Sequence, residues 1–378
     1  MTTTHYDAIV VGARCAGAAT AMLLARRGAR VLLVDSAPPG TDTMSTHALM
    51  RGAVMLLERW GLAEPLRAAG TPQVSRTSFI YGAAALDLDI RPEDGVETLM
   101  APRRYLLDAM LARAAAEAGA GLRYETACVG LLRDDAGRVR GARLASSDGR
   151  TEEVGAALVI GADGKRSRVA RLVGAPVKRQ AGHSVACAYQ YVTELPDRGY
   201  RWHFDLGAAG GLIPTNDGRT CAFVALPEAR AKDLRGAPLP ELAHSRLPCM
   251  AADMEGAVPE AAPVIFAGMR GYFRRCTGPG WALVGDASWF RDPMTAHGIT
   301  DAFRDAALLA EAVTTGTLSG YEALRDRLSG PIFEVSDRIA SFDWSLGELA
   351  GLHKALNRAM KANQAWIAGR PTEERRVA

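Results

Sequence analysis

The chain has 378 residues, of which 48% are hydrophobic and 23% are charged, and its formal net charge is +3. These values are typical of a globular protein with one large domain and a smaller one. The small net charge argues against nucleic acid as a partner, and no stretch approaches the ~20 apolar residues of a membrane-spanning helix. No secretory signal is recognised. We therefore expect a cytoplasmic protein without an integral membrane segment.

The six cysteines are scattered, and no two are close enough to form a Cys-x-x-Cys pair. This spacing predicts neither a metal site nor a dithiol motif, and it suits a reducing compartment. The sequence does not indicate an oligomeric state.

The amino-terminal segment has the pattern of a strand, a turn, a helix and a second strand. Residues 6–11 form a short apolar run rich in β-branched residues, which predicts a buried strand. Residues 12–17 form a glycine turn, 18–27 have helical composition, and 30–34 predict the next strand. This order is typical of the opening of a dinucleotide-binding fold.

The turn carries most of a dinucleotide fingerprint. Gly12 and Gly17 occupy the first and last glycine positions, and Asp35 ends the second strand, where a carboxylate binds a ribose hydroxyl. The middle position holds an arginine, although a glycine there normally lets the backbone approach the pyrophosphate. The helix amino terminus still attracts phosphate. The turn residues that we expect at the cofactor are Gly12, Arg14, Cys15, Ala16 and Gly17.

Further elements follow in chain order. The pattern predicts a helix over 48–62, a small excursion of strands over 75–90, a helix that ends near Gly119, and a meander of strands over 122–160. A second glycine turn, residues 161–164, follows this meander and precedes a basic helix.

A third turn follows another buried strand, residues 281–284. Asp163 and Gly164 lie in the second turn, and Gly285 and Asp286 lie in the third. Each motif is common in loops, but the order and spacing of the three together favour one shared cofactor site.

Residues 183–226 have a different pattern, because aromatic residues alternate along two predicted strands. The chain beyond residue 321 is mostly helical in pattern. We interpret the aromatic sheet as a candidate substrate layer, with a plain core as the alternative. Its alternating aromatic residues are Tyr189, Tyr191, Tyr200, Trp202 and Phe204.

The three turns resemble those of the FAD-dependent aromatic hydroxylases of the para-hydroxybenzoate hydroxylase type. That superfamily also holds geranylgeranyl reductases and flavin-dependent halogenases. The resemblance implies an α/β fold: a Rossmann-like FAD-binding domain, a smaller mixed or antiparallel sheet for the substrate, and a helical carboxyl terminus. We expect the FAD-binding domain in 1–72, 100–180 and 268–330, the substrate domain in 73–99 and 181–267, and the helical segment in 331–378.

The resemblance also implies roles for the three turns. The first turn and Asp35 would bind the ADP half of FAD. The turn of Asp163 and Gly164 would serve both FAD and NAD(P)H. The turn of Gly285 and Asp286 would hold the ribityl chain.

Two arginines and one loop complete the implied cofactor site. Arg104 begins an Arg-x-x-Leu-x-x-x-Leu pattern that contacts the flavin nucleotide, and Arg51 resembles the arginine that reaches the pyrophosphate. Residues 292–298 resemble the loop that faces the isoalloxazine ring, where a helix amino terminus would stabilise negative charge. His297 of this loop would tune protonation. The other implied loop residues are Pro293, Gly298 and Ile299.

The implied reaction uses NAD(P)H and dioxygen to hydroxylate an aromatic or polycyclic small molecule through a flavin C4a-hydroperoxide. An active-site base would assist by deprotonating a phenol, and His47, His183 and His203 are candidates. We expect catalytic roles for His297, His47 and Pro293. The expected substrate contacts are Tyr189, Tyr191, Trp202 and His203.

Other activities stay open at this point. Residues 200–204 resemble the Tyr-x-Trp-x-Phe signature of geranylgeranyl reductases, but Asp205 stands where that family has proline. A halogenase is disfavoured because the Trp-x-Trp-x-Ile-Pro signature is absent. An NAD-dependent dehydrogenase would leave the second and third turns unexplained. A non-catalytic flavin-binding protein is the remaining alternative.

Overall fold

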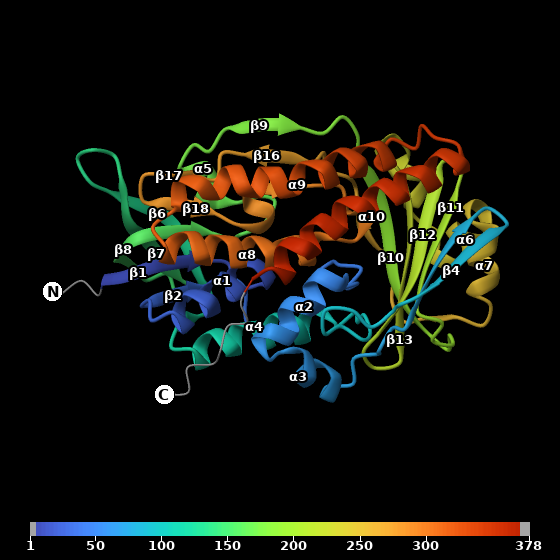
Figure 1. Ribbon diagram of the computed structural model, residues 1–378, viewed down its shortest axis with the longest axis horizontal. Helices are drawn as coiled ribbons and strands as arrows, with labels where there is room; N and C mark the ends of the chain where they lie inside the picture. Colours follow the sequence, from blue (N-terminus) through green and yellow to red (C-terminus); the bar gives the residue numbers. More distant parts are fainter. Residues whose placement is uncertain (1–4, 371–378) are drawn as a thin grey trace.

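The computed structural model describes residues 5–370 and contains two large sheets with helices packed on and between them (Figure 1). The first sheet has a central set of five strands that all run parallel. Within residues 5–370, no helix is both long and apolar enough to cross a membrane. The parallel strands, in spatial order, are β5 (Gly121–Arg123), β2 (Val31–Val34), β1 (His5–Val11), β8 (Thr151–Gly161) and β18 (Trp281–Leu283).

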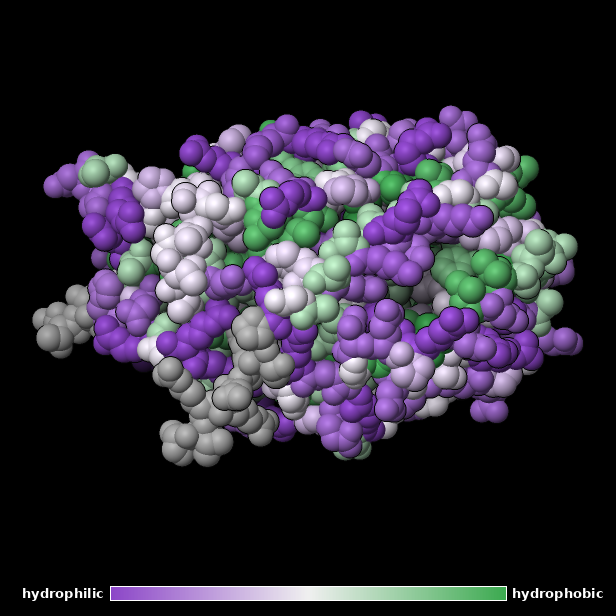
Figure 2. Space-filling view, in the orientation of Figure 1, coloured by the Kyte–Doolittle hydropathy of each residue, from purple (hydrophilic) through white to green (hydrophobic). Residues whose placement is uncertain are grey.

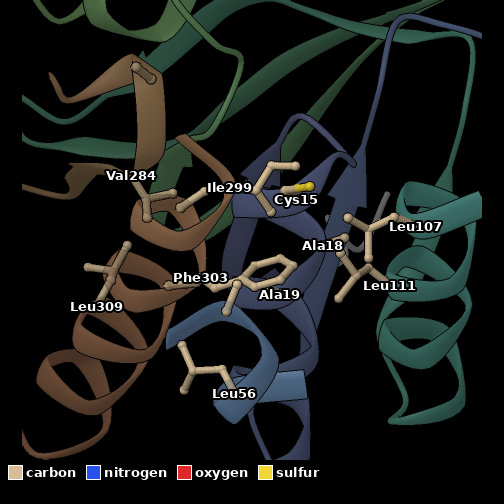
Figure 3. Close-up of a cluster of buried hydrophobic side chains, with 14 of the residues drawn as sticks. Cys15, Ala18, Ala19, Leu56, Leu107, Leu111, Val284, Ile299, Phe303 and Leu309 are labelled. Carbon is tan, nitrogen blue, oxygen red and sulfur yellow. The ribbon is translucent and has the colours of Figure 1, made fainter. Parts of the chain in front are cut away.

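These strands are apolar because helices cover the sheet. α1 (Cys15–Arg26) lies between α4 (Arg104–Glu117) and α8 (Gly298–Thr314). Figure 3 shows Phe303 of α8 beside the small residue Ala19, and leucines of α4 beside Ala18. Small side chains on α1 therefore allow close packing on both of its neighbours.

Antiparallel strands extend the first sheet. β6 (Thr126–Arg133) pairs with β7 (Val139–Ser146), and β7 pairs with the first half of β8. β17 (Thr277–Gly278) pairs with β18. A small third sheet consists of β9 (Val177–Gln180), β16 (Tyr272–Arg274) and β19 (Trp289–Phe290).

The second large sheet is mixed, because β11 pairs with β3 in parallel and the other pairs are antiparallel. Its strands are β3 (Arg76–Tyr81), β4 (Ala84–Asp89), β10 (Val185–Thr193), β11 (Tyr200–Asp205), β12 (Ala208–Thr215), β13 (Arg219–Pro227), β14 (Val258–Pro259) and β15 (Val264–Phe266).

The second sheet has an inner and an outer face, and the side chains of each face pack into a different hydrophobic core. Side chains on the inner face, such as Tyr200 and Trp202, pack into the main core. Those on the outer face, such as Ala186 and Ala188, pack with α6 (Leu239–Arg246) and α7 (Pro248–Asp253). Alternation along the strands assigns each residue to one face.

Short helices connect the sheets, and long helices end the chain. α2 (Arg51–Trp60) and α3 (Ala63–Ala68) follow β2, and α5 (Arg168–Leu172) follows β8. α9 (Leu318–Ala340) packs on α8, and α10 (Leu346–Ala368) packs on α9 and α2. The face in Figure 2 is mostly hydrophilic, with smaller hydrophobic areas between.

The predicted α/β fold with a mixed second sheet and a helical carboxyl terminus is confirmed. All strands of the second sheet come from the segments 73–99 and 181–267 that we assigned to the substrate. α9 crosses the predicted boundary at residue 331, and residues 371–378 lie outside the described part of the chain. The domain boundaries stay predictions.

Candidate functional site

The first glycine turn joins β1 to α1 and packs against the chain that follows β8. Gly12 has a φ of +108°, and a Cβ there would lie 2.5 Å from the carbonyl oxygen of Ala162. A Cβ on Gly17 would lie 1.7 Å from the carbonyl oxygen of Gly12. Both positions therefore need glycine, and the amino terminus of α1 follows directly.

The acid at the end of β2 lies beside this turn. Asp35 accepts hydrogen bonds from the backbone N–H groups of Ala13 at 2.7 Å and Ala37 at 2.8 Å. A carboxylate has about four lone pairs, so roughly two remain for the hydroxyl groups of a ribose. Arg14 precedes α1 and donates a hydrogen bond from Nη1 to Oγ1 of Thr43 at 2.7 Å. Its guanidinium therefore joins the turn to the segment after β2.

Arg104 is held at the amino terminus of α1 by a buried carboxylate. Its guanidinium pairs with Asp108 at 2.9 Å, and Asp108 accepts hydrogen bonds from the Cys15 N–H and thiol. Burial opposes the charge of Arg104, but the nearby acidic groups Cys15, Asp108 and Asp286 raise its pKa above the ordinary value. Arg104 is therefore a fixed positive charge between the first and third turns.

The second turn is stabilised by the carboxylate of Asp163, which lies within the turn. Asp163 accepts hydrogen bonds from the backbone N–H groups of Arg168 at 2.6 Å and Val169 at 3.1 Å, at the start of α5. Gly164 has a φ of +77°, which favours glycine. The carboxylate of Asp163 therefore caps α5, and its contact with FAD stays a prediction.

The third turn touches the first turn of α1. Gly285 has a φ of +60°, and a Cβ there would lie 2.7 Å from the Cβ of Ala16. Asp286 follows, and burial raises its pKa although Lys165 and Arg104 favour its charge. The structure therefore brings all three turns together at the carboxyl ends of β1, β8 and β18, where open α/β sheets bind ligands.

Lys165 also lies at the carboxyl ends of the parallel strands, although no motif in the sequence marks it as a site residue. Its Nζ lies 4.4 Å from the ring centre of Phe266 and 5.0 Å from that of Phe290. Burial lowers the pKa of Lys165, although the charge of Asp286 opposes this shift. Tyr272 donates a hydrogen bond to the carbonyl oxygens of both Lys165 and Asp286, which ties the second turn to the third.

The loop of residues 292–298 lies between β19 and α8 and is hydrogen-bonded to the second sheet. Asp292 is buried and accepts hydrogen bonds from the N–H of Met294 at 3.0 Å and of Val185, at the start of β10, at 2.8 Å. Burial raises the pKa of Asp292 to about 7. One carboxyl group therefore fixes this loop to the sheet.

The predicted loop residues lie together around the start of α8. Pro293 opens a short 3-10 turn, Gly298 begins α8, and Ile299 packs in the main core. His297 is 4% exposed, and its Nδ1 is hydrogen-bonded to the carbonyl oxygen of Thr295. The loop is therefore rigidly held, with its imidazole turned inward.

Two residues predicted for separate roles, His47 and Tyr191, contact each other. Nε2 of His47 is hydrogen-bonded to the Tyr191 hydroxyl, and Arg103 lies 3.9 Å from the Tyr191 ring centre. Burial lowers the pKa of His47 to about 3, with the positive charge of Arg104 the next cause. Burial also raises the pKa of Tyr191 well above its ordinary value. His47 is therefore neutral at pH 7 and a weak base.

The inner face of the second sheet carries most, but not all, of the predicted substrate residues. Tyr189 and Tyr191 are half-buried on β10 and pack against the main core. Trp202 is 5% exposed and donates its indole N–H to Thr77 at 3.0 Å. His203 lies on the opposite face, 3.2 Å from Asp253 of α7. The structure does not bring His203 to the other three.

Two further predicted residues lie apart from the turns. The Arg51 guanidinium donates to the carbonyl oxygens of Arg91, Glu93 and Val96, so it is held by the segment after β4. His183 is half-exposed and lies 3.2 Å from Asp337 of α9. Neither placement supports the role expected from sequence.

The residues present fit FAD. The turn of Gly12 and Gly17 opens a helix, Arg104 supplies a fixed positive charge, and Asp35 keeps acceptor capacity for a ribose. Asp286 adds a buried acceptor for hydroxyl groups at the adjacent strand end. This donor and acceptor set matches a dinucleotide with a polyol chain.

Comparison with known proteins agrees with this site. Residues 5–320 match a family described as "FAD binding domain". The chain is 30% identical over 349 residues to "Menaquinone reductase" of Mycolicibacterium smegmatis, covering 85% of this chain and 79% of the relative. It is 29% identical over 336 residues to "Digeranylgeranylglycerophospholipid reductase" of Methanosarcina acetivorans, covering 83% and 77%.

Solved structures share the fold. The flavin-dependent brominase Bmp2 has a TM-score of 0.81 at 18% identity, covering 98% of this chain and 95% of its own. PqsL of P. aeruginosa, in complex with 2-aminobenzoylacetate, has a TM-score of 0.79 at 21% identity, covering 93% and 100%. The match over residues 5–320 and the 30% identity to a reductase show that the chain belongs to the FAD binding domain family and is an FAD-dependent oxidoreductase.

Proposed function

We propose that the protein is an NAD(P)H-dependent monooxygenase that hydroxylates an aromatic or polycyclic small molecule. The observation that carries this proposal is the His47–Tyr191 pair, because Tyr191 lies on the inner face of the second sheet and His47 is close enough to Arg104 to be affected by its charge. A neutral hydrogen-bonded pair of this kind suits the recognition of a substrate hydroxyl group. Tyr189 beside it, with ring centres 5.9 Å apart, offers an edge-to-face contact for a flat ring.

The three turns would hold the cofactor, with Arg104 and Arg14 near the pyrophosphate and Asp35 at the ribose. Bound FAD would accept a hydride from NAD(P)H and activate dioxygen for transfer of one oxygen atom. The chain's own part is to bind, orient and exclude water. Asp286 would accept hydrogen bonds from the ribityl hydroxyl groups.

His47 and Tyr191 would orient the substrate rather than deprotonate it. Because the pKa of His47 is about 3, its imidazole is too weak a base to take the proton of a phenol, and its hydrogen bond to the Tyr191 hydroxyl fixes the position of that hydroxyl. The hydroxyl oxygen of Tyr191 keeps a lone pair that can accept a hydrogen bond from a phenol. The Arg103 guanidinium lies over the Tyr191 ring and pairs with Asp42 at 2.6 Å, so it helps to fix the position of that ring. This replaces the expectation that His47 is the base.

The test is incorporation of oxygen from ¹⁸O₂ into product by the FAD-loaded protein, supplied with NADPH or NADH and a panel of phenols. One ¹⁸O atom per product supports a monooxygenase. Tyr191→Phe is expected to lower product and raise hydrogen peroxide per NAD(P)H. Tyr6→Phe, at the end of β1 opposite the first turn, should keep the native ratio. Hydrogen peroxide alone with every phenol would contradict the proposal.

A second candidate is a flavin-dependent reductase that saturates a carbon–carbon double bond. It is favoured by the 30% identity to "Menaquinone reductase". The resembling segment 200–204 offers less support, because Tyr200 is 1% exposed and hydrogen-bonded to the Met100 carbonyl oxygen. Anaerobic turnover that adds two hydrogen atoms to an isoprenoid quinone or lipid would support the reductase and exclude the oxygenase.

A further inference from the structure

A small cavity lies between the start of α8 and the helices α2, α9 and α10. Its volume is about 20 Å³. A water molecule needs roughly 10–15 Å³ by this measure, so the cavity has room for one water and not for an aromatic ring. Its polar lining comes from the first turns of α8 and from α10, and its apolar walls are Met50, Ile332, Met360 and Ile367.

Two buried polar atoms belong to residues that line this cavity. Nε2 of His297 and Oγ1 of Thr300 have no hydrogen-bond partner among residues 5–370. His297 is 4% exposed and directly precedes α8, Thr300 lies in the first turn of that helix, and both residues line the cavity. A buried polar atom without a partner is unfavourable, so a ligand that bonds to both atoms is favoured.

The hydrogen bond on the other side of the imidazole fixes its tautomer. Nδ1 of His297 faces the carbonyl oxygen of Thr295, which can only accept, so Nδ1 carries a proton. Neutral His297 therefore presents a lone pair on Nε2. Thr300 presents a hydroxyl group that can donate or accept. One water can donate to Nε2 and also bond to Thr300.

The charged side chains around the cavity, Asp301 and Arg304, already form ion pairs with other residues. Asp301 pairs with Arg291 at 2.7 Å and with Arg304 at 3.2 Å. Arg304 also pairs with Asp305 and donates to the Asn363 side chain at 2.7 Å. These ion pairs engage Asp301 and Arg304, and His297 is the remaining titratable group among the described residues that line the cavity.

We infer that this cavity binds one water molecule and that the water carries protons between solvent and His297. As an N–H bond forms at Nε2, an O–H bond of the water breaks, and solvent returns a proton to the resulting hydroxide. The net change is one proton moved from solvent to His297. Gln364 of α10, which is half-buried on the same wall, marks the side open to solvent.

The role of this charge in catalysis rests on the proposed function, but the water site does not. His297 precedes α8 in the loop predicted to face the flavin. A proton on Nε2 would add positive charge there, and Thr300 acts by positioning the water. The tautomer and the proton exchange of the His297 imidazole can therefore be measured by NMR, independently of turnover.

The experiment is ¹⁵N NMR of the FAD-loaded protein with labelled histidine, with His297 assigned by His297→Gln. We expect an Nδ1–H tautomer, an Nε2 signal that titrates with pH, and exchange with water protons. Thr300→Val should slow the exchange with water protons, and Thr300→Ser should restore the native rate. Thr314→Val, near the end of α8, should not change that rate. An Nε2–H tautomer, or exchange that is unchanged in Thr300→Val, would overturn the inference.

Solvent isotope effects on NAD(P)H oxidation give a second readout in the same variants. A smaller effect of D₂O in Thr300→Val, restored in Thr300→Ser, supports proton delivery through the cavity. The expected NMR pattern, with slower exchange in Thr300→Val, together with an isotope effect that no variant alters overturns the catalytic role and keeps the water site. A protein without any turnover but with the expected NMR pattern would count against the proposed function alone.

Discussion

We predict that Asp292 makes the free energy of unfolding of this protein depend on pH. The substitution Asp292→Asn removes a carboxyl group that is 2% exposed and keeps nearly the same shape. In the native state, burial raises the pKa of Asp292 from 3.8 to about 7, while hydrogen bonds from the N–H groups of Met294 and Val185 oppose the shift. In the unfolded chain the ordinary value returns.

The sign and size of the effect follow from this difference. Between about pH 4 and pH 7 the native state holds a proton that the unfolded state has lost, so the free energy of unfolding falls as the pH rises. A shift of roughly 3 units corresponds to at most about 4 kcal/mol across this interval. Below pH 4 and above pH 7 both states carry the same charge at this group, and the contribution is constant.

The assay is urea unfolding followed by tryptophan fluorescence at several pH values from 4 to 8. We expect the free energy of unfolding to fall less steeply with pH in Asp292→Asn than in the native protein. Asp343→Asn, at an exposed position, is the control and should keep the native slope. Parallel pH profiles for the native protein and Asp292→Asn would refute the argument.

Three more predictions concern the cofactor turns and the buried charges. Arg104→Gln should weaken FAD binding by about 1.5–3 kcal/mol, roughly 10- to 150-fold, because a charge-assisted bond is lost; calorimetry measures this. Asp305→Asn should lower the free energy of unfolding by about 3–5 kcal/mol, since it leaves Arg304 buried without its 2.6 Å partner. Gly17→Ala should prevent FAD loading, measured by flavin absorbance, because its Cβ would lie 1.7 Å from a carbonyl oxygen.

Each of these has a matched control. Arg113 lies on the exposed side of α4, Asp233 pairs with Arg230 at the surface, and a Cβ on Gly320 would meet nothing within 4 Å. Arg113→Gln should keep native FAD affinity, and Asp233→Asn should cost no more than about 1 kcal/mol. Gly320→Ala should load FAD normally. Equal effects in a variant and its control would contradict the corresponding prediction.

The parts of the fold that depend on local pattern could be predicted from the sequence. Apolar runs before the three glycine turns predicted β1, the end of β8 and β18, and parallel strand ends meet at one edge, so the shared position of the turns followed. The faces of β11 were also predictable, because side chains alternate along a strand. That rule places Trp202 and His203 on opposite faces, and grouping them was an error of interpretation.

Contacts between distant segments could not be predicted in this way. Asp108 holds Arg104 beside Cys15, and no pattern in α4 marks that aspartate, since a charged residue on a helix usually faces solvent. The His47–Tyr191 pair joins residues 144 apart. Arg51 matched a motif, yet carbonyl oxygens of a neighbouring segment engage its guanidinium.

The order of strands in the first sheet has a consequence for biosynthesis. β18 is the last of the parallel strands to be translated, and it ends at Leu283, yet it lies directly beside β8 and brings Gly285 against α1. A ribosome must therefore make about three quarters of the 378 residues before the third turn exists. Until then the nascent chain exposes the edge of β8 at residues 159–161, where chaperones can bind. Cofactor capture is thus a late event in the life of each new molecule.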